Sequence, residues 1–471
     1  GVVTGDFQEN DSVVRRNLQG FFVQGPPDAA AGSSDGIFVF DGRNPAVDVS
    51  VGDAVEVVGT VSEYFGETQI EADSVTITGT GSIRPVPLNL PLASLEPFEG
   101  MLVEFTGTLT VTELRNLERF GEVTLSEGGR LFQFTNDNAP DVGGYMDHVS
   151  GIARRSILLD DGLRVENPST IYYLEAGSTP DYSIRLGDTL TGLTGNLRYS
   201  RGAGSNGDEG WRLEPTVDTV FQSANPRPAT PDVGGNLRVG AFNVLNFFTT
   251  IDLGQDNCGP GGNEECRGAD SSVEFTRQRE KIVTALLMSG ADVLGLTELQ
   301  NNSSASLQAL VDAMNARTGS SDFAYIDTGS IHTDVIKAGL IFRSTVVAPV
   351  GNFELLDRNV DSRFNDDRNR PSLAQTFVLN ANGARVTVVV NHLKSKGSSC
   401  EADGDPDLGD GQGNCNLTRV NAAAALADWI ETDPTGSGDP DYLVIGDMNA
   451  YFMEDPIELL RSNGLVDLLE V

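Results

Sequence analysis

The chain has 471 residues, a formal net charge of −36 and only three histidines. At roughly 150 residues per domain, this length suits two to four domains, each with its own core. Hydrophobic residues make up 39% and charged residues 21%, and this composition excludes collagen, coiled coil and wholesale disorder. The apolar runs are too short to cross a bilayer as a helix. The sequence therefore predicts a folded protein with no transmembrane segment.

The acidity extends along the whole chain and is not confined to a tail. Residues 1–230 contain 15 basic and 33 acidic side chains, and the remainder contains 17 and 35, so each part carries −18. Lysine is nearly absent, with four residues against 28 arginines. Depletion of lysine beside excess acid fits a protein that lives in salt, or a generic acidic secreted protein. Taken alone, this charge argues against a polyanionic partner, because phosphate binding normally uses basic surface.

The first 225 or so residues read as all-β, and no helix is expected before residue 274. Short alternating strands are predicted over 20–24, 36–40, 54–61 and 68–77, punctuated by Gly, Pro, Asn and Asp. The segment that begins at Val51 has an echo at Leu186, and both resemble a strand pair of an oligonucleotide/oligosaccharide-binding (OB) barrel. Two OB-like β modules are predicted, over 1–85 and 86–222, although any antiparallel barrel can produce such echoes.

A proline-containing linker is predicted over 223–236, and a layered α/β domain over 237–471. Six strands are predicted in that domain: 237–244, 292–298, 338–343, 373–379, 385–393 and 442–447, with 373–379 and 385–393 joined at the Asn382-Gly383 turn. Helices are predicted over 304–317, 417–430 and 455–462, and over a segment that starts at Ser271 or Ser272 and ends at Gly290.

The four cysteines allow three disulfide connectivities. Pairing of neighbours in the sequence is the simplest, since Cys258–Cys266 and Cys400–Cys415 would each close a loop rich in Gly, Asn and Asp. No C-x-x-C spacing is present, which argues against zinc. Loop-closing disulfides indicate an oxidising compartment, extracellular first and periplasmic second.

Polar side chains follow the apolar strands of the α/β domain. Asn243, Glu298, His392 and Asp447 each stand at such a strand end, and Asn449 follows two residues later. Strand ends are rigid and adjacent, so groups from distant parts of the sequence can converge there. Carboxylates and carboxamides without cysteine are suited to a hard divalent cation. The sequence therefore predicts a site for Mg²⁺, with Mn²⁺ and Ca²⁺ as alternatives.

The motif Gly446-Asp-Met-Asn-Ala450 resembles the G-D-x-N-A motif of the endonuclease/exonuclease/phosphatase superfamily, which includes pancreatic-type deoxyribonucleases. Asn243, Glu298 and His392 occur in that family's order. The wider context resembles bacterial extracellular nucleases of the ExeM/NucH type, including their OB-like region before the catalytic domain. The resemblance implies a four-layer α/β sandwich in the catalytic domain.

The chemistry of the residues and this resemblance together assign the roles. Glu298 is expected to hold the divalent ion with Asn243 beside it, and Asp447 to orient or deprotonate the attacking water. Asn449 is expected to donate to a phosphate oxygen, and His392 to protonate the leaving oxygen or hold a proton against the phosphate. Four basic side chains are expected to bind the substrate phosphates: Arg370, Lys337, Lys394 and Lys396.

The loop closed by the second cysteine pair contains a D-x-D-x-D spacing. Asp403, Asp405 and Asp407 could hold a structural Ca²⁺ through alternate oxygens. Asn414 stands where an EF-hand loop would have its closing Glu, so a solvated acidic loop is the alternative.

The chain also departs from the family pattern, because it contains no S-D-H motif after Asn449. The expectation is a catalytic domain that lacks its C-terminal S-D-H segment. The leading hypothesis is a secreted, monomeric, metal-dependent endonuclease that hydrolyses DNA, with RNA as an alternative substrate. A phosphatase or sphingomyelinase-type phosphodiesterase and a non-catalytic binding protein or adhesin are the alternatives.

Overall fold

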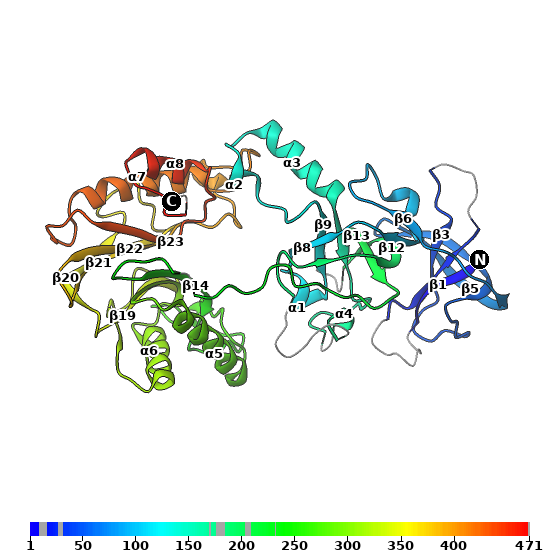
Figure 1. Cartoon of the computed structure of the whole chain (residues 1–471), viewed down its shortest axis with the longest axis horizontal. Coiled ribbons are helices and arrows are strands. Elements are labelled where there is room, and N and C mark those ends of the chain that lie inside the picture. Colours follow the sequence, from blue (N-terminus) through cyan, green and yellow to red (C-terminus); the bar gives the residue numbers. More distant parts are fainter. Residues whose placement is uncertain are drawn as a thin grey trace. The chain divides into compact units, whose positions relative to one another are not determined.

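The computed structural model describes residues 1–8, 17–26, 32–168, 171–175, 184–202, 209–230 and 232–469. The chain divides into two compact units (Figure 1). Unit 1 comprises Gly1–Phe132 and Met146–Arg227, and unit 2 comprises Gln133–Tyr145 and Pro228–Val471. The division after Arg227 falls inside the segment expected to be a linker. The assignment of Gln133–Tyr145 to unit 2 was not expected from the sequence.

Unit 1 begins with a closed five-stranded barrel in the order β1-β2-β3-β5-β4. Its strands are β1 (Val2–Phe7), β2 (Gly20–Gln24), β3 (Gly36–Phe40), β4 (Asp53–Tyr64) and β5 (Glu67–Thr80). The barrel closes where Val2 of β1 pairs with Ala54 of β4. Alternate apolar side chains fill its interior, among them Val3, Phe21 and Val39. A small barrel at this place agrees with the sequence, and its closer assignment as an OB fold remains a prediction.

The rest of unit 1 is built on one eight-stranded sheet in the order β11-β8-β9-β10-β13-β12-β7-β6, not on a second closed five-stranded barrel. The strands are β6 (Val86–Leu88), β7 (Leu102–Phe105), β8 (Leu109–Glu113), β9 (Val123–Glu127), β10 (Ser156–Leu159), β11 (Thr189–Leu190), β12 (Leu193–Arg201) and β13 (Glu209–Pro215). The short helices here are η1 (Glu96–Phe98), α1 (Leu117–Phe120) and α4 (Tyr172–Glu175).

The expectation that no helix precedes residue 274 was wrong. Helix α3 (Val142–Arg155) has 14 residues and α2 (Phe134–Asp137) precedes it. Three glycines, Gly143, Gly144 and Gly151, lower the helix propensity of α3. None of its residues is buried, so the apolar stripe by which a helix is normally recognised has no core to face.

Two buried arginines hold unit 1 together by ion pairs. Arg198 of β12 pairs with Glu67 of β5 and so joins the sheet to the barrel. Arg212 of β13 lies 2.7 Å from carboxylate oxygens of both Glu122 and Asp160. Burial raises the pKa of the Glu122 carboxyl, against the attraction of Arg212. These carboxylates therefore depend on the guanidinium, because an unpaired buried charge is strongly destabilising.

Unit 2 contains two four-stranded sheets. The first has the order β14-β17-β19-β18 and the second β20-β21-β22-β23. Their strands are β14 (Val239–Phe247), β17 (Val293–Gln300), β18 (Phe323–Tyr325), β19 (Ile336–Arg343), β20 (Val347–Leu356), β21 (Arg370–Leu379), β22 (Arg385–His392) and β23 (Tyr442–Asp447). The small elements are β15 (Asp256–Cys258), β16 (Glu264–Glu265) and η2 (Glu401–Asp403).

The two sheets of unit 2 lie between two pairs of helices (Figure 1). Helices α5 (Ser272–Ser289) and α6 (Ala305–Thr318) pack on the first sheet through Ile282, Leu310 and neighbouring side chains. Helices α7 (Asn416–Glu431) and α8 (Asp455–Ser462) pack on the second. A third apolar cluster fills the space between the sheets, with side chains that include Leu340, Phe377 and Val390. This is the layered α/β arrangement that the sequence predicted.

Local signals account for the boundaries of several of these elements. The Ser271 hydroxyl caps α5 by accepting from the backbone N–H of Glu274, and Gly290 ends the helix in a left-handed conformation.

The two disulfides join Cys258 to Cys266 and Cys400 to Cys415, which confirms the pairing of sequence neighbours. In the described part of the chain, no helix is long and apolar enough to span a membrane.

Replacement of Arg212 by Leu tests the buried ion pairs of unit 1. Glu122 and Asp160 would lose their counter-ion, and the free energy of unfolding of this unit should fall by about 3–5 kcal/mol at neutral pH. The loss should be smaller in mild acid, because the raised pKa of Glu122 lets that carboxyl take up a proton.

Trp211 is in unit 1 and the other tryptophan, Trp429, is in unit 2. In a Trp429→Phe background, fluorescence in a urea titration therefore follows unit 1 alone. The matched control is Arg119→Leu, because the Arg119 side chain is 53% exposed beside Glu166. This substitution should lower the free energy of unfolding by less than about 1 kcal/mol. Equal effects of the two substitutions would contradict the role of Arg212.

Candidate functional site

Strand pairing brings the predicted strand-end residues to one edge of unit 2. Strands β22 and β23 run parallel with His392 opposite Asp447, and antiparallel β21 places Arg370 opposite His392. In the other sheet, parallel β14 and β17 place Asn243 opposite Thr297, the residue before Glu298. Residues far apart in the sequence therefore stand at the same level of the two sheets.

The amide of Asn243 joins the two sheets at this edge. Its Nδ2 donates to Oε1 of Glu298 at 2.8 Å and to Oδ2 of Asp447 at 3.0 Å. The second oxygen of Glu298 accepts the backbone N–H of Asn246 at 2.9 Å. Asp447 Oδ1 accepts the backbone N–H of Asn449 at 2.9 Å. Both carboxylates are thus held in fixed directions.

The backbone around these side chains is unusual. Leu245, Asn246, Glu298 and Asn449 all have φ between 48° and 63°, a region that residues other than glycine seldom occupy and that is enriched at functional sites. Gly446 has a φ of 121°, and a Cβ there would lie 2.1 Å from the carbonyl oxygen of Asn391. Only glycine therefore lets β23 run close enough to β22 to deliver Asp447.

The side chains fit a divalent cation. Glu298, His392 and Asp447 each offer one ligand atom, and these atoms all lie within 4.8 Å of one another. His392 is 3% exposed, and its Nδ1 has no hydrogen-bond partner among the described residues. Two carboxylates and a neutral imidazole are a common donor set for divalent ions.

Asn243 differs from its predicted role as a metal ligand. Its amide nitrogen faces the two carboxylates, and its oxygen accepts the backbone N–H of Leu245 at 2.9 Å. In this arrangement Asn243 orients Glu298 and Asp447 and does not present an oxygen to an ion.

Burial and, second, the positive charge of Arg370 together lower the pKa of His392 from 6.5 to about 4. Asp447, Glu298 and Asp334 oppose this shift. The imidazole is therefore neutral at pH 7 and can accept a proton or bind an ion. Donation of a proton to a leaving oxygen would require a higher pKa, which a phosphate anion beside the ring would favour.

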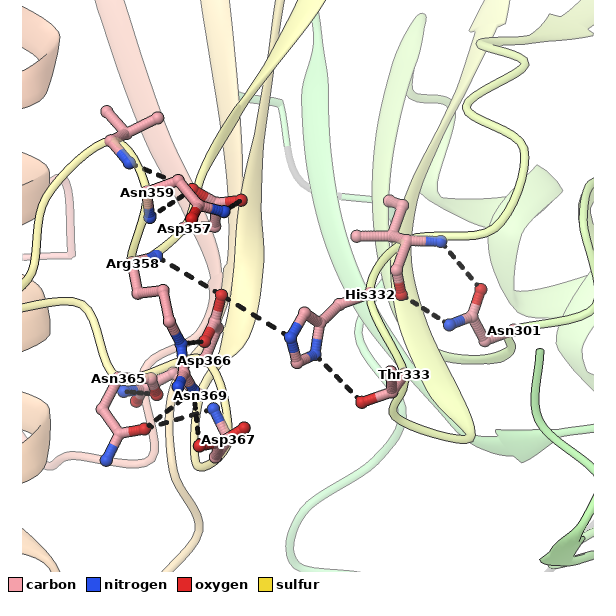
Figure 2. A network of polar contacts seen from close by, with 12 residues as sticks. Asn301, His332, Thr333, Asp357, Arg358, Asn359, Asn365, Asp366, Asp367 and Asn369 are labelled. Atoms are coloured by element: carbon pink, nitrogen blue, oxygen red, sulfur yellow. Dashed lines mark hydrogen bonds and ion pairs between the residues drawn. The ribbon is translucent and has the colours of Figure 1, made fainter. Parts of the chain in front are cut away.

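A second group of potential ligands consists of His332, Asp366 and Asp367, and here the two carboxylates already share an arginine partner. Figure 2 shows His332 facing Asp366, with Arg358 on the other side of that carboxylate. The guanidinium of Arg358 pairs with both aspartates, at 2.6 Å from Asp367, and His332 Nε2 is 3.7 Å from Asp366. This contact joins the β18–β19 loop to the β20–β21 loop. In the group of Glu298, His392 and Asp447, by contrast, no arginine or lysine side chain forms an ion pair with either carboxylate among the described residues.

The four predicted phosphate-binding residues separate into two pairs. Arg370 lies by His392 and makes an ion pair with Asp334 at 2.9 Å. Lys396 lines the same groove as Asp447. Lys337 is 1% exposed, and its ammonium donates to Thr328 and to the carbonyl of Gly329.

Lys394 is 7% exposed and donates to Ser398 Oγ at 2.8 Å and to the carbonyl of Ser395 at 3.0 Å. The structure therefore places Arg370 and Lys396 at the site. The ammonium groups of Lys337 and Lys394 instead form hydrogen bonds with nearby loop residues. Burial lowers the pKa of Lys337 to about 8, which agrees with a structural position.

The structure does not gather the three aspartates of the expected calcium loop. Asp403 pairs with Arg368 at 2.7 Å. Asp405 accepts the backbone N–H groups of Leu417 and Thr418 at the start of α7. Asp407 accepts the backbone N–H of Gly409. Each carboxylate thus serves a local bond, and the D-x-D-x-D spacing reflects helix capping and turns.

Several residues that support the site carried no sequence signal. Arg419 is fully buried and donates to the carbonyls of Lys394, Gln412 and Asn414, which fixes the loop that carries Lys396. Glu454 is also fully buried and pairs with Lys396. A Pro after Glu454 marks the start of a helix, but the burial of the carboxylate depends on contacts distant in the sequence.

A pH titration of stability tests the buried, neutral state of His392. Unfolded histidine binds a proton below about pH 6.5, whereas folded His392 does so only near pH 4. The free energy of unfolding should therefore decrease as the pH falls through this window, by on the order of 3 kcal/mol. The variant His392→Gln should lack this part of the pH-dependent decrease in the free energy of unfolding.

The measurement is urea unfolding of unit 2 in the presence of EDTA, followed by Trp429 in a Trp211→Phe background. The free energy of unfolding is plotted against pH for the parent and for His392→Gln, and the difference between these two curves should shrink as the pH falls. Parallel curves from pH 7 to pH 4 would contradict a buried neutral imidazole.

Replacement of Asn243 by Asp tests the position of the amide between two carboxylates. Without metal, the third carboxylate should lower the stability of unit 2 by about 1–3 kcal/mol, because a donor is replaced by a like charge. Added Mg²⁺ should recover more stability in this variant than in the parent. Asn263→Asp, an added charge in an exposed loop, is the control, and an equal response of both variants to Mg²⁺ would sink the assignment.

Comparison with known proteins gives distant structural matches only. No protein-family model and no curated protein matches the chain. The chain is similar to the catalytic domain of human Nocturnin with bound sulfate (16% identity, 49% of this chain and 69% of that chain, TM-score 0.31). It is similar to an endonuclease/exonuclease/phosphatase from Bacteroides vulgatus (18%, 49% and 72%, TM-score 0.31). It is also similar to D. rerio TDP2 complexed with a single-strand DNA product (14%, 49% and 66%, TM-score 0.28).

The Bacteroides vulgatus neighbour carries the name of the endonuclease/exonuclease/phosphatase superfamily, to which the motifs above point. At such identities and TM-scores the neighbours carry no argument about this chain's chemistry, and the ExeM/NucH subtype remains a prediction.

Proposed function

We propose that the chain is a metal-dependent phosphodiesterase that hydrolyses DNA in an extracellular setting. The observation that supports this most is the convergence of Glu298, His392 and Asp447 within 4.8 Å, with the amide of Asn243 between the two carboxylates. Arg370 stands beside them at the strand end. This is a cation site next to a phosphate-binding guanidinium, at the end of two rigid sheets.

The residues divide the work of hydrolysis among them. Glu298 and His392 would hold the ion, and Asp447 would orient the attacking water and accept its proton. Arg370 would bind a non-bridging phosphate oxygen with the fork of its guanidinium. Asn449 has one amide N–H on the carbonyl of Leu393, and its other N–H would serve a phosphate oxygen.

A bound divalent ion would supply charge neutralisation at the phosphate and would lower the pKa of a coordinated water. The protein contributes the fixed directions of the carboxylates, because Asn243 and two backbone N–H groups donate to all four of their oxygens. Preorganised groups of this kind need no rearrangement in the transition state.

Part of the proposed site opens into a groove of about 1730 Å³. Its lining includes Asn243, Asp447, Asn449 and Lys396, together with apolar side chains of β23, α7 and α8. The two disulfides fit an oxidising compartment, and the net charge of −36 fits a protein surrounded by salt.

Replacement of Glu298 by Gln tests the proposal. The variant should lose at least about 100-fold in kcat/KM on DNA, because a charged ligand of the ion is removed while shape is kept. Release of acid-soluble nucleotides from DNA is the measurement, with Mg²⁺ and then with EDTA. The matched control is Glu280→Gln, whose side chain is 44% exposed on α5.

The control should retain the parent activity, and EDTA should abolish the activity of the parent. Activity of the parent that persists in EDTA would rule out the metal mechanism. Full activity of Glu298→Gln would rule out the assigned site.

A further inference from the structure

The segment Gln133–Tyr145 is part of unit 2, although the chain on both sides of it belongs to unit 1. The backbone N–H of Met453 donates to the carbonyl of Thr135 at 2.9 Å. Gly411 has a φ of 96°, and a Cβ there would lie 3.0 Å from Cγ2 of Thr135. The close approach of the segment therefore requires glycine at this position, and the segment is an integral part of the unit.

Thr135 reaches a buried carboxylate. Its Oγ1 donates to Oε1 of Glu454 at 2.6 Å, and the ammonium of Lys396 pairs with the same oxygen. Glu454 is 0% exposed, and its Oε2 has no hydrogen-bond partner among the described residues. A carboxylate this buried holds an ammonium firmly, because separation of the pair would leave an uncompensated charge.

The same ammonium lies 4.6 Å from the centroid of the Tyr451 ring, a cation–π contact. The Lys396 side chain is 25% exposed and Tyr451 is 40% exposed. Both residues line the groove that contains Asp447 and Asn449. An ammonium has three N–H donors, so the contacts with Glu454 and the ring leave it capacity to bind an anion in the groove.

We infer that Lys396 and Tyr451 form a subsite for a neighbouring nucleotide of a polynucleotide strand, with the phosphate on the ammonium and the sugar or base against the ring. Thr135 and Glu454 are positioning residues that fix the ammonium. This inference rests on the function proposed above and narrows its substrate to a strand that extends beyond the scissile bond. A ring with a neighbouring cation is the combination by which proteins bind single strands without sequence preference.

Two substrates separate this subsite from the reacting centre. A DNA oligonucleotide can occupy the subsite, whereas bis(p-nitrophenyl) phosphate has no neighbouring nucleotide. Tyr451→Ala should lower the ratio of kcat/KM for the oligonucleotide to kcat/KM for the small diester by roughly tenfold, mainly through KM. Tyr451→Phe keeps the ring and should restore the ratio.

The positioning residues have their own readout. Glu454→Gln should raise the KM for the oligonucleotide more than it changes kcat, and should alter the salt dependence of KM, because the ammonium is no longer fixed by a charge. Thr135→Val removes only the hydroxyl donor and should have the same effect in smaller degree. Lys281→Met, an exposed lysine on α5, should leave both activities unchanged.

The outcomes distinguish the inference from the proposed function. Loss of activity in Glu298→Gln together with an unaltered substrate ratio in Tyr451→Ala would leave the proposed function intact and overturn the subsite. Equal losses on both substrates in Tyr451→Ala and Glu454→Gln would show damage to the reacting centre and would also overturn it. A parent protein that cleaves neither substrate would remove the proposed function and the subsite with it.

Discussion

Parallel pairing of β22 with β23 sets the position of the whole candidate site. The register places His392 directly opposite Asp447, and Gly446 permits this register because no side chain could occupy its position. The other sheet has its own parallel pair, β14 and β17, which ends at the same edge. One amide, that of Asn243, then contacts a carboxylate of each sheet. The positions of the candidate site residues thus depend on the register of the parallel strands, which is a property of the backbone.

Charge in this molecule is organised by local pairing. The chain has a net charge of −36, and Arg370 and Lys396, the two predicted phosphate-binding residues that lie at the site, are both kept in place by acid partners. Asp334 holds Arg370, and Glu454 holds Lys396. Such pairing lowers the conformational freedom of the long side chains before any ligand arrives, and pre-organisation of this kind is a general source of affinity.

The sequence predicted those features that follow from local patterns. The strand ends with Asn243, Glu298, His392 and Asp447 converge as expected, because parallel strands that end at one edge leave little choice of position. The amide direction of Asn243 and the burial of Lys337 and Lys394 could not be predicted, since each depends on partners from other loops. Helix α3 was missed because three glycines lower its helix propensity, although its apolar residues recur at helical spacing; none of its residues is buried. Asp405 looked like a calcium ligand, but the start of α7 uses it as a cap.

The assignment of Gln133–Tyr145 to unit 2 has a consequence for how the chain can be assembled and divided. The ribosome synthesises this segment about eighty residues before the rest of its unit. Unit 2 therefore folds completely only when the later residues have joined the earlier segment. Domains that fold as contiguous stretches can be exchanged between proteins as cassettes. Unit 2 cannot be exchanged in this way, because cutting at the linker would leave Glu454 without the Thr135 hydroxyl. A transplanted unit 2 would need both pieces of the chain.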